Sequence, residues 1–191
     1  MGFLVDDDQS ALMWRGLILA KAVEQFLTDV DWGELDYLLV DMPPGTGDIQ
    51  MALARLVPQS EMLVVTTPSR GAQQVAARVG DMAQRSFMPV IGVVENMSYF
   101  VSPDGAKHAI FGEGGGERLA KRLATKLLAQ IPIESEMTEA NAKGEPLVLN
   151  NSSQTADALN ALATQLTTEI CPPVQLATCT AHLAELLENL N

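Results

Sequence analysis

Short continuous apolar runs alternate along this chain with stretches in which apolar residues recur at helical spacing. Four runs lack the alternation of a half-exposed strand and are typical of strands buried on both faces: residues 35–40, 62–66, 90–94 and 127–131. Helical spacing predicts six helices around them: residues 12–30, 49–56, 70–85, 116–125, 154–170 and 181–190. Strands separated by helices form βαβ units, so the pattern predicts an α/β fold with a doubly wound, mainly parallel sheet.

Residues 97–116 interrupt this alternation. Two short apolar stretches flank the turn-forming sequence Ser102-Pro103-Asp104-Gly105, which predicts a small hairpin. The glycine-rich string Gly112-Glu113-Gly114-Gly115-Gly116 then opens a helix. A helix N-terminus can bind an anion, but no strand feeds this one as a dinucleotide fingerprint requires. We interpret these glycines as a tight turn with close packing.

Charge and length exclude several function classes. The chain has 191 residues, with 12 Lys and Arg against 24 Asp and Glu, so its net charge is −12. Such acidity argues against a nucleic-acid partner, and no apolar run approaches the roughly 18 residues that span a membrane. The N-terminal stretch carries Asp6-Asp7-Asp8 instead of the basic start of a signal peptide. We therefore expect a cytoplasmic protein with no membrane partner.

Two minor features have ordinary explanations. One is the pair of cysteines, Cys171 and Cys179, whose spacing fits neither Cys-x-x-Cys nor the usual zinc patterns, so free structural thiols are expected. The other is a basic cluster for which a solvated helix face is favoured over a binding stripe: Arg118, Lys121, Arg122 and Lys126.

The segment of residues 32–48, WGELDYLLVDMPPGTGD, carries the most chemical information. A strand that ends in Asp at the ligand edge of a sheet matches the Walker B pattern, in which the carboxylate meets magnesium directly or through water. We therefore assign Asp41 to magnesium and Asp48 to the attacking water or the magnesium shell, as candidate catalytic residues. Candidate cofactor-binding residues lie between them in a loop that can bend towards a γ-phosphate: Pro43, Pro44, Gly45, Thr46 and Gly47. For an isolated strand-end Asp an ordinary turn is the alternative, and the intact string disfavours it.

This segment resembles the signature of the Mrp/ApbC family, P-loop ATPases that carry iron–sulfur clusters and are related to MinD, ParA and the nitrogenase iron protein. The resemblance covers roughly residues 3–150 and includes several further strings: Trp14-Arg15-Gly16, Val65-Thr66-Thr67-Pro68, Gly92 to Ser98, Ile110-Phe111-Gly112, Ile131-Pro132 and Gly144-Glu145-Pro146. It implies a P-loop NTPase fold of the MinD-like class with a deviant Walker A, and ATP and Mg²⁺ as cofactors. It also implies that Asn96 recognises adenine, that the complete protein is a homodimer, and that iron–sulfur recipient apoproteins are its partners.

The first departure from the family is that no Gly-x-x-x-x-Gly-Lys-Ser/Thr string occurs. The family's phosphate loop lies upstream of the region that matches Met1, so the chain resembles the C-terminal portion of a longer protein. Residues 1–170 would be the Walker B and switch II half of a partial P-loop domain, and residues 171–191 a tail with a short helix. We expect weak or absent ATP binding and no ATP hydrolysis by this chain alone, and apolar strand edges left unpaired.

The second departure lies in the predicted hairpin. Many relatives carry Cys-x-x-Cys there, and the matching positions are Ser102 and Gly105, which offer no thiolate to a bridging iron–sulfur cluster. For His108 a position on the surface or packed within the hairpin is favoured over metal binding. The leading hypothesis is an iron–sulfur cluster carrier ATPase of the Mrp type. A MinD/ParA-like regulatory ATPase without a cluster and a non-catalytic binding module remain the alternatives.

Overall fold

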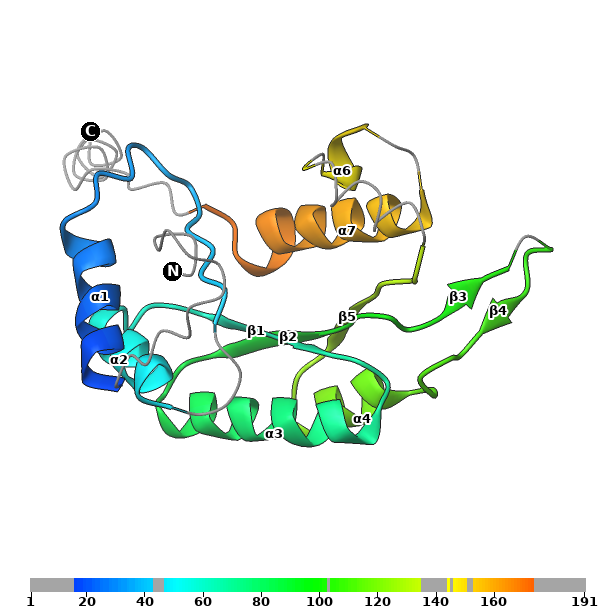
Figure 1. Ribbon diagram of the computed structural model, residues 1–191, viewed down its shortest axis with the longest axis horizontal. Helices are drawn as coiled ribbons and strands as arrows, with labels where there is room; N and C mark the ends of the chain where they lie inside the picture. Colours follow the sequence, from blue (N-terminus) through cyan, green and yellow to red (C-terminus); the bar gives the residue numbers. More distant parts are fainter. Residues whose placement is uncertain are drawn as a thin grey trace, which may run out of the picture.

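Three parallel strands with helices on both faces form the centre of the molecule (Figure 1). The computed structural model describes residues 16–42, 47–102, 104–134, 144, 146–150 and 153–173. The helices are α1 (Gly16–Thr28), α2 (Asp48–Leu56), α3 (Arg70–Arg85), α4 (Gly115–Arg122), α6 (Leu147–Asn150), α7 (Gln154–Gln165) and the π-helical turn η2 (Leu166–Ile170). The strands are β1 (Met62–Thr66), β2 (Val90–Glu95), β3 (Phe100–Val101), β4 (Lys107–His108) and β5 (Leu127–Gln130).

The main sheet has the order β1-β2-β5, and both pairings are parallel. Helices α3 and α4 cover one face and α7 covers the other (Figure 1). The larger core lies under α3 and α4 and includes Val64, Val93 and Leu119, while the smaller one joins Val94 to Leu162 of α7. The predicted α/β class with a doubly wound parallel sheet is confirmed.

Elements with strong local signals form where the sequence predicts them. The strand at residues 62–66 and the helix at residues 70–85 have the predicted bounds. The helix begins there because the Ser69 hydroxyl accepts a hydrogen bond from the amide of Ala72 at 3.3 Å, as an N-cap does. The predicted hairpin is β3 paired antiparallel with β4.

The predicted strand at residues 35–40 is wrong. These residues have no regular secondary structure, and Leu39 is 92% exposed. A buried parallel strand exists only when neighbours pair with it, and none of the described strands pairs with this segment or with the outer edge of β1. Among the described residues the outer edge of β1 therefore has no paired strand.

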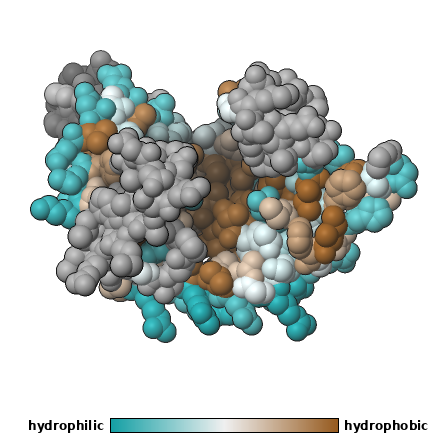
Figure 2. All heavy atoms as spheres, viewed as in Figure 1, coloured by the Kyte–Doolittle hydropathy of each residue, from teal (hydrophilic) through white to brown (hydrophobic). Residues whose placement is uncertain are grey.

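An apolar surface accompanies this open edge. Figure 2 shows apolar residues gathered in the hollow at the middle of the face, where Figure 1 places the sheet. Val65 of β1 is 57% exposed, which is unusual for a strand of a parallel sheet.

The C-terminal part contains the predicted helix over residues 154–170, with a change of pitch. Its last turn is the π-helical η2, which closes with a hydrogen bond from the amide of Cys171 to the carbonyl of Leu166 at 2.7 Å. The predicted terminal helix at residues 181–190 lies outside the described residues. None of the described helices is long and apolar enough to cross a membrane.

Candidate functional site

The carboxyl ends of β1, β2 and β5 meet at one edge of the sheet, where ligands bind in open α/β folds. Main-chain hydrogen bonds tie the following loops together. The amide of Asn96 donates to the carbonyl of Thr66 at 2.8 Å, and the amide of Ile131 donates to the carbonyl of Glu95 at 2.8 Å. The amide of Ser98 then donates back to the carbonyl of Ile131 at 2.9 Å. These hydrogen bonds hold the loops that follow β1, β2 and β5 together, and we call this edge of the sheet the platform.

Asn96, the residue implied to recognise adenine, is half-buried on this platform. Its side-chain oxygen accepts a hydrogen bond from the amide of Met97 at 2.9 Å, and Met97 has a left-handed backbone with φ 55°. Among the described residues the Asn96 NH₂ group has no acceptor. A fixed amide with a free donor suits hydrogen bonding to a ring nitrogen of a base.

Sequence reasoning did not find the role of Glu95, which is 1% exposed at the end of β2. Its carboxylate accepts hydrogen bonds from the amide of Gly116 at 2.5 Å and from the Gln130 side chain at 2.9 Å. The Ser98 hydroxyl lies 2.8 Å from the same carboxylate. Glu95 thus joins the loop beside Asn96 to α4 and β5. The available signal was an acidic residue that ends an otherwise apolar strand.

Close packing explains the glycines that open α4, as predicted. A Cβ on Gly115 would lie 2.7 Å from Cα of Pro68, and one on Gly116 would lie 2.8 Å from Cβ of Glu95. Gly114 has φ +66°, a left-handed backbone that favours glycine. The start of α4 is therefore pressed against the loops that follow β1 and β2.

The structure describes only part of the Walker B segment. Asp41 is exposed at the end of the irregular segment and has no hydrogen bond or ion pair with any described residue. Pro43, Pro44, Gly45 and Thr46 lie outside the described residues, while Gly47 is the N-cap residue of α2 and Asp48 its first residue. No described hydrogen bond connects Asp41 to the platform around Asn96. The magnesium and switch roles of this segment stay predictions.

The described residues match a nucleotide base better than its phosphates. Asn96 offers a free donor at the ligand edge, whereas the sequence contains no phosphate-loop string that would supply a lysine, a magnesium-binding hydroxyl and cradling amides. An exposed Asp41 is compatible with a carboxylate that meets magnesium through water.

The hairpin does not match an iron–sulfur cargo. Ser102 hydrogen-bonds to Asp104, and its hydroxyl lies 3.0 Å from Nε2 of His108, while Gly105 has φ +84° at the turn. The Ser102 hydrogen bond lowers the pKa of the Asp104 carboxyl. These are oxygen and nitrogen donors where cluster binding needs thiolates. No group of three or more His, Cys, Asp or Glu among the described residues is placed to hold a metal.

Comparison with known proteins identifies the family to which this chain is similar. Residues 1–167 match the ParA family model described as NUBPL iron-transfer P-loop NTPase. The chain is 46% identical over 152 residues to an iron–sulfur cluster carrier protein of Mycobacterium leprae, covering 76% of this chain and 40% of the relative. It is 46% identical over 169 residues to a carrier of the same name from Synechocystis, covering 87% of this chain and 48% of the relative. The chain thus spans about half the length of these curated relatives.

Solved structures share the fold. A nucleotide-binding protein from Archaeoglobus fulgidus in complex with ADP is 36% identical, with a TM-score of 0.58 over 67% of this chain and 53% of that chain. MinD from Pyrococcus horikoshii complexed with Mg-ADP has a TM-score of 0.60 at 19% identity, over 84% of this chain and 60% of that chain. The MinD likeness concerns the fold alone.

Proposed function

This chain belongs to the family of NUBPL iron-transfer P-loop NTPases, and we propose that it is the magnesium-aspartate and base-binding portion of an ATP-dependent iron–sulfur cluster carrier. The observation that carries the proposal is the half-buried Asn96, with a free side-chain donor on the platform formed by the ends of β1, β2 and β5. The relatives that match most of the chain are named iron–sulfur cluster carriers, which supports the assignment.

In this proposal the phosphates are bound by a segment outside the present sequence. A phosphate loop follows directly after a strand in P-loop proteins, so the segment that supplies it also brings a strand. The outer edge of β1 has no partner among the described strands, and Val65 within β1 is exposed. A strand paired there would satisfy the main-chain hydrogen-bonding groups at the outer edge of β1. It would also provide a strand with which the exposed run at residues 35–40 could pair.

The assignments within the Walker B segment follow from the same proposal. When bound, Mg²⁺ would neutralise charge on the transferred phosphate, and Asp41 would hold its hydration shell. Residues 43–47 would follow the γ-phosphate, and Asp48 would orient the attacking water. Nucleotide state would then change the position of this loop and, through it, the interface of a homodimer that delivers clusters to recipient apoproteins.

The proposal is tested by titrating ATP in a calorimeter. The chain alone is compared with a longer polypeptide in which the segment preceding the matched region of the Synechocystis relative is fused before Met1. We expect the fusion to bind Mg-ATP and the chain alone to bind it weakly or not at all. Low-micromolar ATP binding by the chain alone would contradict the requirement for a separate phosphate loop.

A second titration isolates the role of Asn96. In the fusion, Asn96→Ala is expected to weaken ATP binding about tenfold, the value of one buried hydrogen bond, and to leave tripolyphosphate binding unchanged. Asn160→Ala, on the exposed face of α7, serves as the matched control. Equal losses for both ligands would place Asn96 away from the base.

A regulatory ATPase without a cluster is the second candidate function, and the hairpin favours it. The positions that carry Cys-x-x-Cys in many relatives hold Ser102 and Gly105 here. Anaerobic incubation of the fusion with iron and sulfide, followed by gel filtration and absorption spectroscopy, separates the two functions. A stable absorbing cluster excludes this candidate, and its absence alongside ATP hydrolysis favours it.

A further inference from the structure

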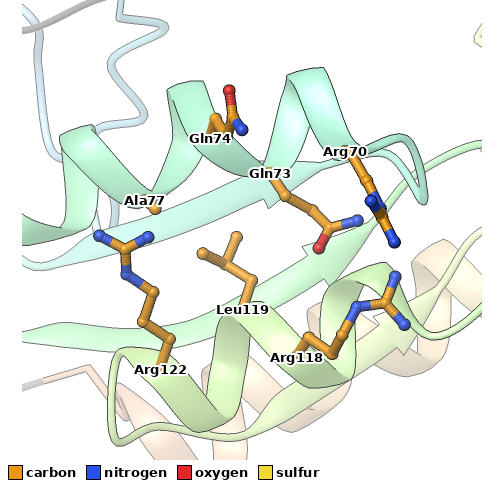
Figure 3. A pocket seen from close by; sticks show the side chains of 7 residues that line it. All are labelled: Arg70, Gln73, Gln74, Ala77, Arg118, Leu119 and Arg122. Atoms are coloured by element: carbon orange, nitrogen blue, oxygen red, sulfur yellow. The ribbon is translucent and has the colours of Figure 1, made fainter.

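A groove with a positive lining runs between α3 and α4, and its lining includes none of the residues of the platform that carries Asn96. Small residues of α3 pack against Leu119 of α4 and against Leu123, which directly follows α4. The open groove above this contact has a volume of about 330 Å³. Its lining comes from both helices (Figure 3): Arg70, Gln73, Gln74, Ala77, Arg118, Leu119 and Arg122.

Three guanidinium groups dominate this lining, and none of the lining residues is acidic. Arg70 and Arg118 extend towards each other from opposite helices at one end, and Arg122 lies at the other end (Figure 3). The chain has only 12 basic residues against 24 acidic ones, so three arginines in one groove form a local exception to its charge.

The positive charge in the groove is only partly compensated. Arg122 forms an ion pair with Asp81 at 3.0 Å, with both side chains largely exposed. Arg118 donates to the main-chain carbonyl of Glu113 at 3.0 Å. This carbonyl is uncharged, so no carboxylate among the described residues forms an ion pair with the Arg118 guanidinium. Arg70 has no hydrogen bond or ion pair with any residue that the structure describes. Two guanidinium groups of like charge thus face one another without a counter-ion in this part of the chain.

We propose that this groove binds an acidic segment of a partner protein in an extended conformation. Guanidinium groups match carboxylates because they donate two parallel hydrogen bonds. Arg118 and Arg122 are four residues apart on α4, about 6 Å along the helix axis. Alternate residues of an extended strand are about 6.6 Å apart, so a segment with carboxylates at positions i and i+2 fits both arginines.

The shape and surroundings of the groove favour a polypeptide over other anions. The groove is partly open to solvent, whereas small-molecule sites enclose most of their ligand. Ala77 and Leu119 provide a buried apolar floor for methylene groups, and exposed Gln74 can hydrogen-bond to a peptide main chain. Nucleic acid is disfavoured because the remaining surface of a chain with net charge −12 repels a dense line of phosphates.

The sequence alone favoured a solvated face for the basic residues of α4. The structure separates them: Arg118 and Arg122 line the groove, whereas Lys121 is exposed and absent from the lining. Arg70 is the first residue of α3 and lies 48 residues before Arg118 in the sequence. The packing of α3 beside α4 brings the two residues to the same groove.

The test is fluorescence anisotropy with a labelled peptide in which glutamate alternates with serine. We expect binding that weakens as salt is raised, and no binding of the same peptide with glutamine in place of glutamate. Arg118→Gln is expected to weaken binding about fivefold, the upper range for one exposed ion pair, and the double variant Arg70→Gln/Arg118→Gln considerably more. Arg85→Gln, at the far end of α3 and outside the lining, is the matched control.

Two results would overturn the proposal. One is unchanged peptide affinity in the double variant whose circular dichroism spectrum matches the unmodified chain. The other is displacement of the peptide by inorganic phosphate or pyrophosphate at equal concentration, which would indicate a site for small anions. The binding is expected without ATP, so failure of the nucleotide proposal would leave this result unaffected.

Discussion

Replacing Glu95 by alanine removes the carboxylate that joins three segments of the ligand edge. The side chain is 1% exposed, and the amide of the buried Gly116 donates to it at 2.5 Å. In the alanine variant this amide is left without an acceptor, at a cost of about 1–3 kcal/mol. The Ser98 hydroxyl still donates to the main-chain carbonyl of residue 95 at 3.0 Å, and the exposed Gln130 side chain can hydrogen-bond to water. The loss of their contacts with the carboxylate therefore adds little to the destabilisation. Together with the small cavity, the expected loss of unfolding free energy is about 2–4 kcal/mol.

The glutamine variant separates shape from hydrogen bonding. In Glu95→Gln the amide oxygen can still accept from Gly116, and the new NH₂ group can face Ser98, whose hydroxyl is able to accept, and Gln130, whose amide can rotate. We therefore expect a loss of about 1 kcal/mol or less. The measurement is a urea titration followed by circular dichroism, with Glu24→Ala on exposed α1 as the control. The reasoning is refuted if Glu95→Ala lies within about 0.5 kcal/mol of the unmodified chain, or if both variants lose equally.

Three further predictions concern packing, pH dependence and thiol reactivity. Gly92→Ala would place a Cβ 2.5 Å from Cγ of Leu128, so calorimetry should show a destabilisation of about 1–3 kcal/mol. Burial works to raise the pKa of Glu134, but hydrogen bonds from the first turn of α7 outweigh it and hold the pKa below the ordinary 4.5. Its stabilisation is therefore present above that pH and lost as the pH falls through the folded-state pKa, so Glu134→Gln should cost less than about 1 kcal/mol at neutral pH and nothing in acid. Burial and a 2.7 Å hydrogen bond to Glu61 raise the pKa of Cys171 to about 11, so iodoacetamide should modify it slowly and Glu61→Gln should accelerate the reaction, as followed by peptide mass spectrometry.

Each of these predictions has a matched control. Gly71→Ala adds a Cβ with no atom within 4 Å and should leave stability nearly unchanged. Glu24→Gln should show no comparable loss at neutral pH. An unfolded sample in urea gives the reference rate for the Cys171 thiol, and equal rates in folded and unfolded chains would contradict the raised pKa.

Local sequence signals determined much of the sheet and its helices. The apolar run at residues 62–66 and the Ser69 cap with its helix to Arg85 have the predicted bounds, because burial pattern and capping are written within a few residues. The family was recognised in the same way, from contiguous strings such as the one around Asp41. Asn96 lies at the ligand edge because it directly follows β2, while its implied role in adenine recognition stays a prediction.

Tertiary structure decided what depends on residues distant in the chain. The run at residues 35–40 has the composition of a buried strand, yet a strand needs a pairing neighbour, and the described sheet provides none. Glu95 obtains its role from Gly116 and Gln130, which are 21 and 35 residues away. Arg70 and Arg118 line the same groove only because α3 and α4 pack side by side on one face of the sheet. Hydrophobic periodicity fixes which face of an element is buried, while partners across the fold fix what its polar groups contact, and those partners are set by packing rather than by neighbouring residues.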